Sequence, residues 1–596
     1  MCGIFGILSM EGKLDRIRFR IPNETSILEH RGPDDFGNFI DGQVYLGHRR
    51  LSIIDLASGG QPIFNEDQTS CVVFNGEIYN FQEIKSELEA RGHHFTTNSD
   101  TEVIIHAYEE FGEKCIDRFR GMFAFAIWDD RNQVLFLARD RLGIKPLFYA
   151  LHEGVFYFAS EMKAILQYRD FPREIDQDGL ASYFSLSYIP APLTIFKHIR
   201  KLLPGHFLEI RGGKVRTSQY WDVSFNPDRS KKQDYFVDGF IDILEEAVKL
   251  RLISDVPLGA FLSGGIDSGT IVALMSRFTT EPVRTFTVGF GGNIGGYLDE
   301  RQYATQVASK YDTFHSEYEA FPNFQCIVED IIKAFDEPFA DHSTIPTYYI
   351  SKAARESVKV ALSGLGGDEL FGGYERYLGL KLSNLYNLLP KMVREKIIKE
   401  VIEKLPERAD GHYTVNHIKR FIRSASLPHG VRYYKFSTVL GDDKEESFFS
   451  EPEKYRENLD YCQELFLRYF NRLNPCEPLD RVFYTDIKTY LPEDILACTD
   501  RMSMWHALEV RVPFLDHKLV EFCATIPSEM KIRLWDKKYI LKKALLNVLP
   551  RDVLTHRKQG FEGPMTSGYE TLSSITRQKF SARVTLIGTG YSTRTQ

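Results

Sequence analysis

The segment 257–270, PLGAFLSGGIDSGT, constrains the fold more than any other part of the chain. Its apolar run 258–262 predicts a short buried strand, and the apolar run 271–275 predicts the continuation of a helix. Between the two runs, Ser263-Gly264-Gly265 can adopt backbone angles that are closed to bulkier residues. Because free N–H groups and the positive end of a helix dipole point into such a loop, the pattern predicts an anion site.

The side chains of this loop suit a phosphate bound together with a metal ion. Ser263 and Ser268 add hydroxyl donors. The carboxylate of Asp267 would be unfavourable beside a phosphate unless it helps to hold a cation. The loop lacks the Gly-Lys-Ser/Thr ending of a Walker-A loop. SGGIDS resembles instead the pyrophosphate-binding loop of the ATP pyrophosphatase family; the alternative is an ordinary strand-to-helix turn.

Length, charge and cysteine content limit the class of protein. The 596 residues suggest two to four domains at roughly 150 residues each. A formal charge of −8 argues against nucleic acid as a partner, and no apolar run reaches the roughly 18 residues that span a membrane. The eight cysteines include no CxxC pair, and the N-terminus lacks the pattern of a signal peptide. We therefore expect a cytoplasmic protein without disulfides or structural zinc.

Cys2 is the first candidate nucleophile. Removal of Met1 would leave an α-amine on Cys2, and such an amine has a pKa near ~7.7–8.0. It could then act as a base toward its own thiol, as in N-terminal nucleophile enzymes. The alternative is a small buried residue at the start of a strand over 3–8.

Polar groups in the next hundred residues suit a zwitterionic amino acid. Arg50, at the start of a predicted strand, can bind a carboxylate through two parallel hydrogen bonds. Asn75 and Gly76 follow the end of another predicted strand and can form an oxyanion hole. Glu77 and Asp100 can each bind an ammonium group.

The motifs MCGI, RGPD, RRLSIID, NGEIYN and NSDTE occur in that order, and the set resembles the class II glutamine amidotransferase domain. The resemblance implies that Cys2 attacks the side-chain amide of glutamine and releases ammonia. It implies that Asn75 and Gly76 form the oxyanion hole, with Asn75 also contacting glutamine. Arg50 would hold the glutamine carboxylate, and Glu77 and Asp100 its amine.

Later strands extend the unit around the first loop. Strands predicted over 283–290 and 358–362 alternate with helices, so we expect a parallel, right-handed sheet with ligands beyond its carboxyl ends. Val288 would then offer backbone groups to an adenine. The glycine-rich segment 363–374 implies a close approach of the backbone to a ligand, and it places Asp368 near phosphates and magnesium.

The motifs SGGIDS, SGLGGDELFGGY, DRMSM, EVRVPFLD and KKYILKKAL resemble the synthetase domain of glutamine-hydrolysing asparagine synthetases. With the N-terminal set, the resemblance covers about residues 2–561. It implies that Mg-ATP adenylates the side chain of aspartate and that ammonia displaces AMP. Magnesium would be held by Asp267 and Asp368. The implied ATP-binding residues are Leu262, Ser263, Gly264, Gly265, Asp267, Ser268, Val288, Ser363, Gly364, Asp368 and Lys538.

The resemblance also implies a two-domain α/β fold. Residues 2–222 would form an αββα sandwich of the N-terminal nucleophile hydrolase type. Residues 235–564 would form a doubly wound parallel-sheet domain of the ATP-pyrophosphatase type with extra helices, and we expect the tail 565–596 to be poorly ordered.

One departure from the family pattern bears on the acceptor. Asparagine synthetases commonly carry an acidic residue at the position of Leu365. Three alternatives therefore stay open: asparagine synthesis, amidation of another carboxylate such as a sugar acid, peptide or natural-product precursor, and a non-catalytic relative or bare glutaminase. The oligomeric state is also open, with a homodimer among the alternatives.

Overall fold

The computed structural model describes residues 2–12, 14, 24–290, 299–320, 324–405, 414–439, 452–473 and 476–556. The tail 565–596, for which we predict poor order, lies outside these residues, as does the end of the second predicted domain. Among the helices described, none is long and apolar enough to cross a membrane.

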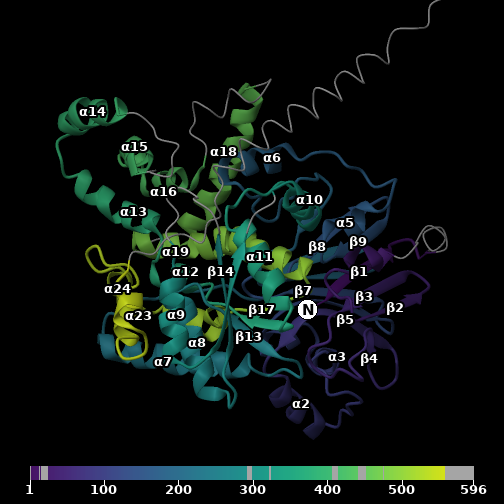
Figure 1. Ribbon diagram of the computed structural model, residues 1–596. Helices are drawn as coiled ribbons and strands as arrows, with labels where there is room; N and C mark the ends of the chain where they lie inside the picture. Colours follow the sequence, from purple (N-terminus) through teal and green to yellow (C-terminus); the bar gives the residue numbers. More distant parts are fainter. Residues whose placement is uncertain are drawn as a thin grey trace, which may run out of the picture.

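Two antiparallel sheets form the N-terminal part of the molecule (Figure 1). The first contains, in spatial order, β10 (Arg200–Lys201), β8 (Phe148–His152), β9 (Val155–Ala159), β1 (Gly3–Ser9), β3 (Val44–Arg50) and β2 (Asp35–Asp41). The second contains β12 (Lys214–Gln219), β11 (His206–Arg211), β7 (Val134–Arg139), β6 (Gly121–Asp129), β5 (Ser70–Ile78) and β4 (Ile63–Phe64).

The alternation of side chains along these strands explains the four-layer order. On β6, Ala124 and Ala126 pack between the two sheets, whereas Phe123 and Phe125 face the helices on the outside. On β1, Ile4 packs between the sheets, and its neighbours on the strand face the opposite outer layer. Because side chains alternate between the faces of a strand, two buried faces require a nearly continuous apolar run. The predicted αββα sandwich is confirmed.

Helices α2 and α3 cover the second sheet, and η1 and α5 cover the first. The helices of this part are η1 (Glu24–Leu28), α2 (Phe81–Ala90), α3 (Glu102–Phe111), η2 (Gly112–Lys114), α4 (Cys115–Arg118), α5 (Met162–Leu166) and α6 (Gln177–Leu186).

The third sheet is parallel throughout, in the order β15 (Phe314–Ala320), β14 (Arg284–Phe290), β13 (Leu258–Phe261), β16 (Val360–Leu362) and β17 (Glu509–Arg511). The chain runs outward from β13 to β15 and then returns to the other side of β13. The strand order therefore reverses between β13 and β16, and ligands of such sheets bind at this switch point. The predicted doubly wound sheet is confirmed.

Many helices surround this sheet, and Figure 1 places α13–α16 on the side of the molecule opposite the N-terminal sheets. Their bounds are α7 (Gln233–Leu250), α8 (Ile266–Phe278), α9 (Arg301–Lys310), α10 (Phe324–Phe335), α11 (Thr344–Arg355), α12 (Gly367–Phe371), α13 (Glu375–Tyr386), η3 (Val393–Ile398), α14 (Lys399–Glu403), α15 (Thr414–Ser424), α16 (His429–Ser437), α18 (Pro452–Arg472), α19 (Pro478–Lys488), η5 (Leu491–Ile495), α20 (Leu496–Trp505), η6 (Pro513–Leu515), α21 (His517–Cys523), α22 (Ser528–Lys531), α23 (Tyr539–Ala544) and α24 (Arg551–Thr555).

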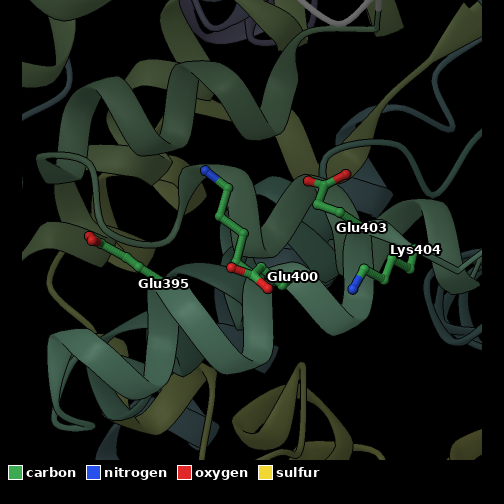
Figure 2. A pocket seen from close by; sticks show the side chains of 5 residues that line it. Glu395, Glu400, Glu403 and Lys404 are labelled. Atoms are coloured by element: carbon green, nitrogen blue, oxygen red, sulfur yellow. The ribbon is translucent and has the colours of Figure 1, made fainter.

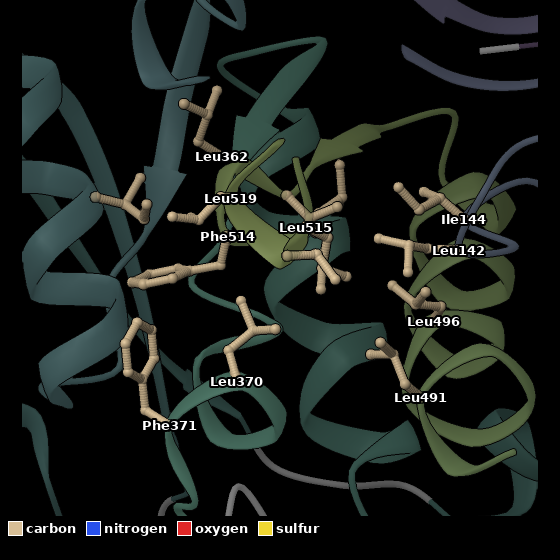
Figure 3. Close-up of a cluster of buried hydrophobic side chains, with 14 of the residues drawn as sticks. Leu142, Ile144, Leu362, Leu370, Phe371, Leu491, Leu496, Phe514, Leu515 and Leu519 are labelled. Atoms are coloured by element: carbon tan, nitrogen blue, oxygen red, sulfur yellow. The ribbon is translucent and has the colours of Figure 1, made fainter. Parts of the chain in front are cut away.

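One apolar core joins the two parts of the chain. Leu142 and Ile144, which follow β7, belong to the same cluster of buried side chains as Leu496 on α20 and Leu515 on η6. Figure 3 shows Ile144, Leu142 and Leu496 next to one another, with Leu515 beside them. Because the cluster is continuous, separating the two parts would expose apolar surface on both sides.

Leu142→Ala should therefore destabilise the whole protein. Leu142 is 2% exposed, and truncating a buried leucine typically costs about 2–5 kcal/mol. We expect a clear fall in the denaturant midpoint, measured by fluorescence. Leu151→Ala is the matched control, because Leu151 is 51% exposed. Equal shifts for the two variants would contradict the shared core.

Candidate functional site

Cys2 directly precedes β1 and is buried. Its backbone N–H donates to Oδ1 of Asn75 at 3.0 Å. This bond leaves the Asn75 Nδ2 group buried and without a hydrogen-bond partner among the described residues. A buried amide donor beside a thiol is the arrangement that an oxyanion requires. Burial raises the pKa of the Cys2 thiol, while the positive N-terminal amine lowers it.

The structure corrects the placement of Asn75, Gly76 and Glu77. We predicted that they follow the end of a strand, but β5 continues to Ile78, and Gly76 pairs with Phe123 of β6. Gly76 has φ +155°, and a Cβ there would lie 2.0 Å from the carbonyl oxygen of Met122. The strand therefore continues because glycine permits the close approach of β6.

Arg50 is the last residue of β3, not the first residue of a strand as predicted. Its Nη2 donates to the backbone oxygens of Ile54 at 3.2 Å and Asp55 at 2.5 Å. The guanidinium is thereby fixed in a buried position, and its charge lowers the pKa of the Cys2 thiol. Arg50 and Cys2 are thus brought into one pocket.

Glu77 and Asp100 are both buried beside Cys2, within reach of each other's charge. The Oδ2 atom of Asp100 accepts the backbone N–H of Ile78 at 2.9 Å. Burial, and then the nearby carboxylate of Glu509, raise the pKa of Asp100 to about 6. Burial and the Glu509 carboxylate also raise the pKa of Glu77 well above its usual value. The raised pKa values favour the protonated forms of both acids, and a cation bound beside them would lower these pKa values again.

Two residues of β17 reach this pocket from the third sheet. Arg511 donates from Nε to Oε1 of Glu509 at 2.6 Å, and its Nη2 lies 3.3 Å from Oε1 of Glu77. All three side chains are buried. Despite burial, the positive charges around Glu509, that of Arg511 among them, lower its pKa, so Glu509 ionises more readily than Glu77. We quoted EVRVPFLD as a motif but assigned no role to these two residues.

A second buried arginine links the same two parts. Arg31 donates from Nε to the carbonyl oxygen of Cys2 at 3.0 Å, and from Nη1 to Oε1 of Glu161 at 2.8 Å. It also forms two hydrogen bonds with the carboxylate of Asp500 on α20, at 2.9 and 3.2 Å. The motifs RGPD and DRMSM, which are far apart in the sequence, therefore meet at one guanidinium.

The predicted phosphate loop lies at the switch point between β13 and β16. Ser263 and Ser268 are joined by a hydroxyl–hydroxyl contact of 3.1 Å, and the Ser263 N–H donates to Oγ of Ser268 at 3.2 Å. Gly264 has φ +84°, and a Cβ there would lie 2.7 Å from the carbonyl oxygen of Glu300. Helix α8 begins directly afterwards, with Gly265 as its N-cap. The loop thus has the strand–loop–helix form that binds anions.

A cavity of about 850 Å³ opens over this loop. Most of the predicted nucleotide-binding residues line it, whereas Leu262, Gly264, Val288 and Lys538 do not. Val288 is buried within β14, the neighbour of β13. The predicted residues that line the cavity are Ser263, Gly265, Asp267, Ser268, Ser363, Gly364 and Asp368.

Lys538 connects the two predicted metal ligands. Its Nζ lies 2.5 Å from Oδ2 of Asp267 and 2.7 Å from Oδ1 of Asp368. The residue is 4% exposed and precedes α23. The two carboxylates therefore both contact the Lys538 ammonium group, although they come from the first turns of two different helices, α8 and α12.

The cavity is also lined by charged residues to which we assigned no role from the sequence. Glu369 accepts the hydroxyl of Tyr374 at 2.6 Å, and burial beside Asp368 raises the pKa of Glu369 to about 7. Arg376 donates to Asp486 at 2.8 Å. Glu369 and Tyr374 lie within the motif SGLGGDELFGGY, and Arg376 lies just after it. Their place in or near this motif could have indicated that they line the site. Asp486 lies in a region without any motif.

A second hollow, lined by Glu395, Lys399, Glu400, Glu403 and Lys404, takes its walls from η3 and α14 (Figure 2). These side chains include both acidic and basic residues and are mostly exposed, so water screens and solvates their charges. The cavity over residues 263–268, which has buried charged groups in its wall, is therefore the better candidate for a catalytic site.

Comparisons with known proteins agree with this architecture. The family described as a glutamine amidotransferase domain matches residues 1–221, and the asparagine synthase family matches residues 239–591. The chain is 35% identical to asparagine synthetase 1 (glutamine-hydrolyzing) of Bacillus subtilis, over 95% of this chain and 87% of that protein. It is 31% identical to asparagine synthetase 3 of the same organism, over 98% and 92%. It is 29% identical to amidase chry2 of Gibberella zeae, over 95% and 89%.

Proposed function

Because the chain belongs to the family of glutamine-hydrolysing asparagine synthetases, we propose that it makes asparagine from aspartate, glutamine and ATP. Water and ATP are consumed, and glutamate, AMP and pyrophosphate are released. The observation that carries the proposal is the apolar core that joins the N-terminal part, which contains Cys2, to the part that holds the cavity over residues 263–268. The proposal assigns the two half-reactions to residues 2–222 and 235–564.

In the first half-reaction, Cys2 attacks the side-chain amide of glutamine. Removal of Met1 would give Cys2 the free α-amine that takes the thiol proton. Asn75 would stabilise the oxyanion through its Nδ2 group, with Gly76 as the second donor. Arg50 would bind the substrate carboxylate, and Glu77 and Asp100 its ammonium group. An incoming ammonium ion supplies the charge that these buried acids need in order to ionise.

In the second half-reaction, ATP binds over the loop 263–268 with its phosphates at the start of α8. The residues fit a magnesium ion, because Asp267 and Asp368 both reach the ammonium group of Lys538, which stands in for a cation. Magnesium, when bound, would neutralise charge on the phosphates. Lys538 would contribute a further positive charge near the leaving pyrophosphate, and Ser363 and Gly364 would close the other side of the nucleotide.

Aspartate requires a partner for its ammonium group, and Leu365 does not offer one. Leu365 does line the cavity, so the departure lies at the site itself. Glu369, Asp341 and Asp494 line the same cavity and supply carboxylates. We propose that these acids take over the role that an acidic residue at position 365 would have.

Ammonia would travel from Cys2 to the second site without entering solvent. The apolar core between the two pockets includes Met122, Leu142 and Ile144 from the N-terminal part. An apolar passage favours neutral ammonia, because burying an ammonium ion without a partner is costly. We also place the protein in the cytoplasm, which agrees with the free thiols of the cysteines within the described residues.

Cys2→Ala should abolish synthesis from glutamine and leave synthesis from added ammonia intact, because the second site does not use the thiol. Product is measured by amino-acid analysis with each nitrogen donor. Cys476→Ala, a change at a half-buried thiol far along the chain, should leave both activities unchanged. Persistence of glutamine-dependent product in Cys2→Ala would show that the nucleophile is misassigned.

Asp267→Asn should reduce the release of AMP and pyrophosphate at least a hundredfold and leave glutaminase activity measurable. Pyrophosphate is measured with aspartate and then with other carboxylates as acceptors. Asp242→Asn, an exposed change on α7, is the control. Release of ADP in place of AMP, or turnover of other carboxylates without aspartate, would contradict the proposed reaction.

The KM for glutamine should rise as the pH falls through about 6. Asp100 has a pKa of about 6, so its carboxylate is ionised above this pH and becomes neutral below it. A neutral acid loses the ion pair with the substrate ammonium, and a hydrogen bond to a charged group is worth about 1.5–3 kcal/mol. Asp100→Asn should raise KM roughly tenfold or more at pH 7.5 and flatten this pH dependence. An unchanged pH profile of KM in Asp100→Asn would rule out this role.

A further inference from the structure

Four metal-ligating side chains converge on the outer face of the amidotransferase part, away from both pockets. Glu66 lies in the turn between β4 and β5, and His93 lies just after α2. His106 and Glu109 are one helical turn apart on α3 and therefore share a face. The ligand atoms of these four residues all lie within 4.8 Å of one another.

The spacing of the ligand atoms fits a tetrahedral ion. Nδ1 of His106 is 3.1 Å from Oε2 of Glu109 and 3.4 Å from Oε2 of Glu66. Nδ1 of His93 is 3.5 Å from Oε1 of Glu66 and 3.9 Å from Oε2 of Glu109. Zinc binds nitrogen and oxygen at about 2.0–2.1 Å, so adjacent ligands of a tetrahedral site lie roughly 3.4 Å apart. Only small side-chain movements would be needed to admit the ion.

The outer contacts direct both imidazoles toward the same point. Nε2 of His106 lies 3.6 Å from Oε1 of Glu102, and Nε2 of His93 lies 3.6 Å from Oε2 of Glu110. These contacts are longer than hydrogen bonds, but the negative charge near each Nε2 favours a proton on that atom, and Nδ1 of each ring faces the other acids of the cluster. Glu102 is itself fixed, because it accepts the backbone N–H groups of Thr96 and Thr97 at 2.8 and 2.7 Å. Metal-binding histidines commonly have such a carboxylate behind them.

Each of the two acids also accepts a hydrogen bond from a neighbouring group. Oε1 of Glu109 accepts from Nδ2 of Asn65 at 2.6 Å, which leaves Oε2 facing the histidines. Oε1 of Glu66 accepts the backbone N–H of His94 at 3.0 Å. This Oε1 is the oxygen nearer to His93, and Oε2 remains toward His106. His106 is 1% exposed at its side chain, whereas Glu66 is 35% exposed, so the site is anchored inside and open to entering ions.

We propose that Glu66, His93, His106 and Glu109 bind one zinc ion with a structural role. Two neutral imidazoles and two carboxylates balance the charge of a divalent cation, and mixed nitrogen and oxygen ligands suit zinc. The ion would tie the β4–β5 turn to the segments on either side of Asp100. Our expectation of no structural zinc considered cysteine ligands, and this site uses histidine and glutamate.

The test uses the full chain, stripped with a chelator and then titrated with Zn²⁺ in a calorimeter. Wild type should bind one more equivalent of zinc than His93→Gln, because the variant lacks one ligand. His94→Gln is the matched control, since this neighbouring histidine is exposed and lies outside the cluster; it should bind as wild type does. Zinc bound at the nucleotide cavity would be common to all three and cancels in the comparison. Equal stoichiometry in wild type and His93→Gln would overturn the proposal.

A second readout protects the test against misfolding of one variant. Zn²⁺ should raise the Tm of wild type and of His94→Gln, because a ligand that binds only the folded state stabilises it. It should raise the Tm of Glu66→Gln much less, and Glu66 is exposed enough for this change to be tolerated. An equal rise in Glu66→Gln, or the absence of any rise in wild type, would show that the cluster is held by protons and ion pairs alone.

Discussion

The buried guanidinium of Arg31 is the interaction on which the arrangement of the two active parts depends. A buried charge is costly unless it is paired and fully hydrogen-bonded. The partners of Arg31 come from the strand that carries the nucleophile, from Glu161 at the end of the first sheet, and from Asp500 on α20. The charge is therefore satisfied only when the N-terminal strand and the helix-rich part are docked together.

The buried charge of Arg511, on the third sheet, is likewise paired with both of its carboxylate partners only when the two parts of the chain are docked together. Its guanidinium lies between Glu509 and Glu77, so an edge strand of the third sheet contacts the strand that carries Asn75 and Glu77. The backbone oxygen of Arg511 also accepts the N–H of Ser363, which begins the glycine-rich loop of the cavity. One residue thus contacts both Glu77 of the N-terminal part and the first residue of the glycine-rich loop.

Much of the fold could be predicted because its signals are local. The apolar run 258–262 indicated a short buried strand, and SGGIDS indicated a loop between a strand and a helix. The strand that carries Asn75 was predicted too short, because a polar Asn-Gly-Glu sequence is typical of a turn and only pairing with β6 extends it. The contacts of Arg31 with Asp500 and of Arg511 with Glu77 join residues hundreds of positions apart. No spacing in the sequence could indicate them.

The metal-ligating cluster shows the same limit. His93 and His106 are not at a spacing that suggests a common ligand set, and Glu66 is further away still. They meet because α2 and α3 pack on the same sheet and bring their ends together beside the β4–β5 turn. Contacts between polar side chains that are distant in the sequence could therefore be recognised only in the structure.

The central claim is that nitrogen passes from the Cys2 pocket to the cavity over residues 263–268 inside the protein. The direct test is to supply glutamine labelled with ¹⁵N in its amide, together with aspartate, Mg-ATP and an excess of unlabelled ammonium, and to measure the label in asparagine by mass spectrometry. We predict asparagine far richer in ¹⁵N than the ammonia in solution. Asparagine whose label equals that of the bulk ammonia would contradict internal transfer between the two sites.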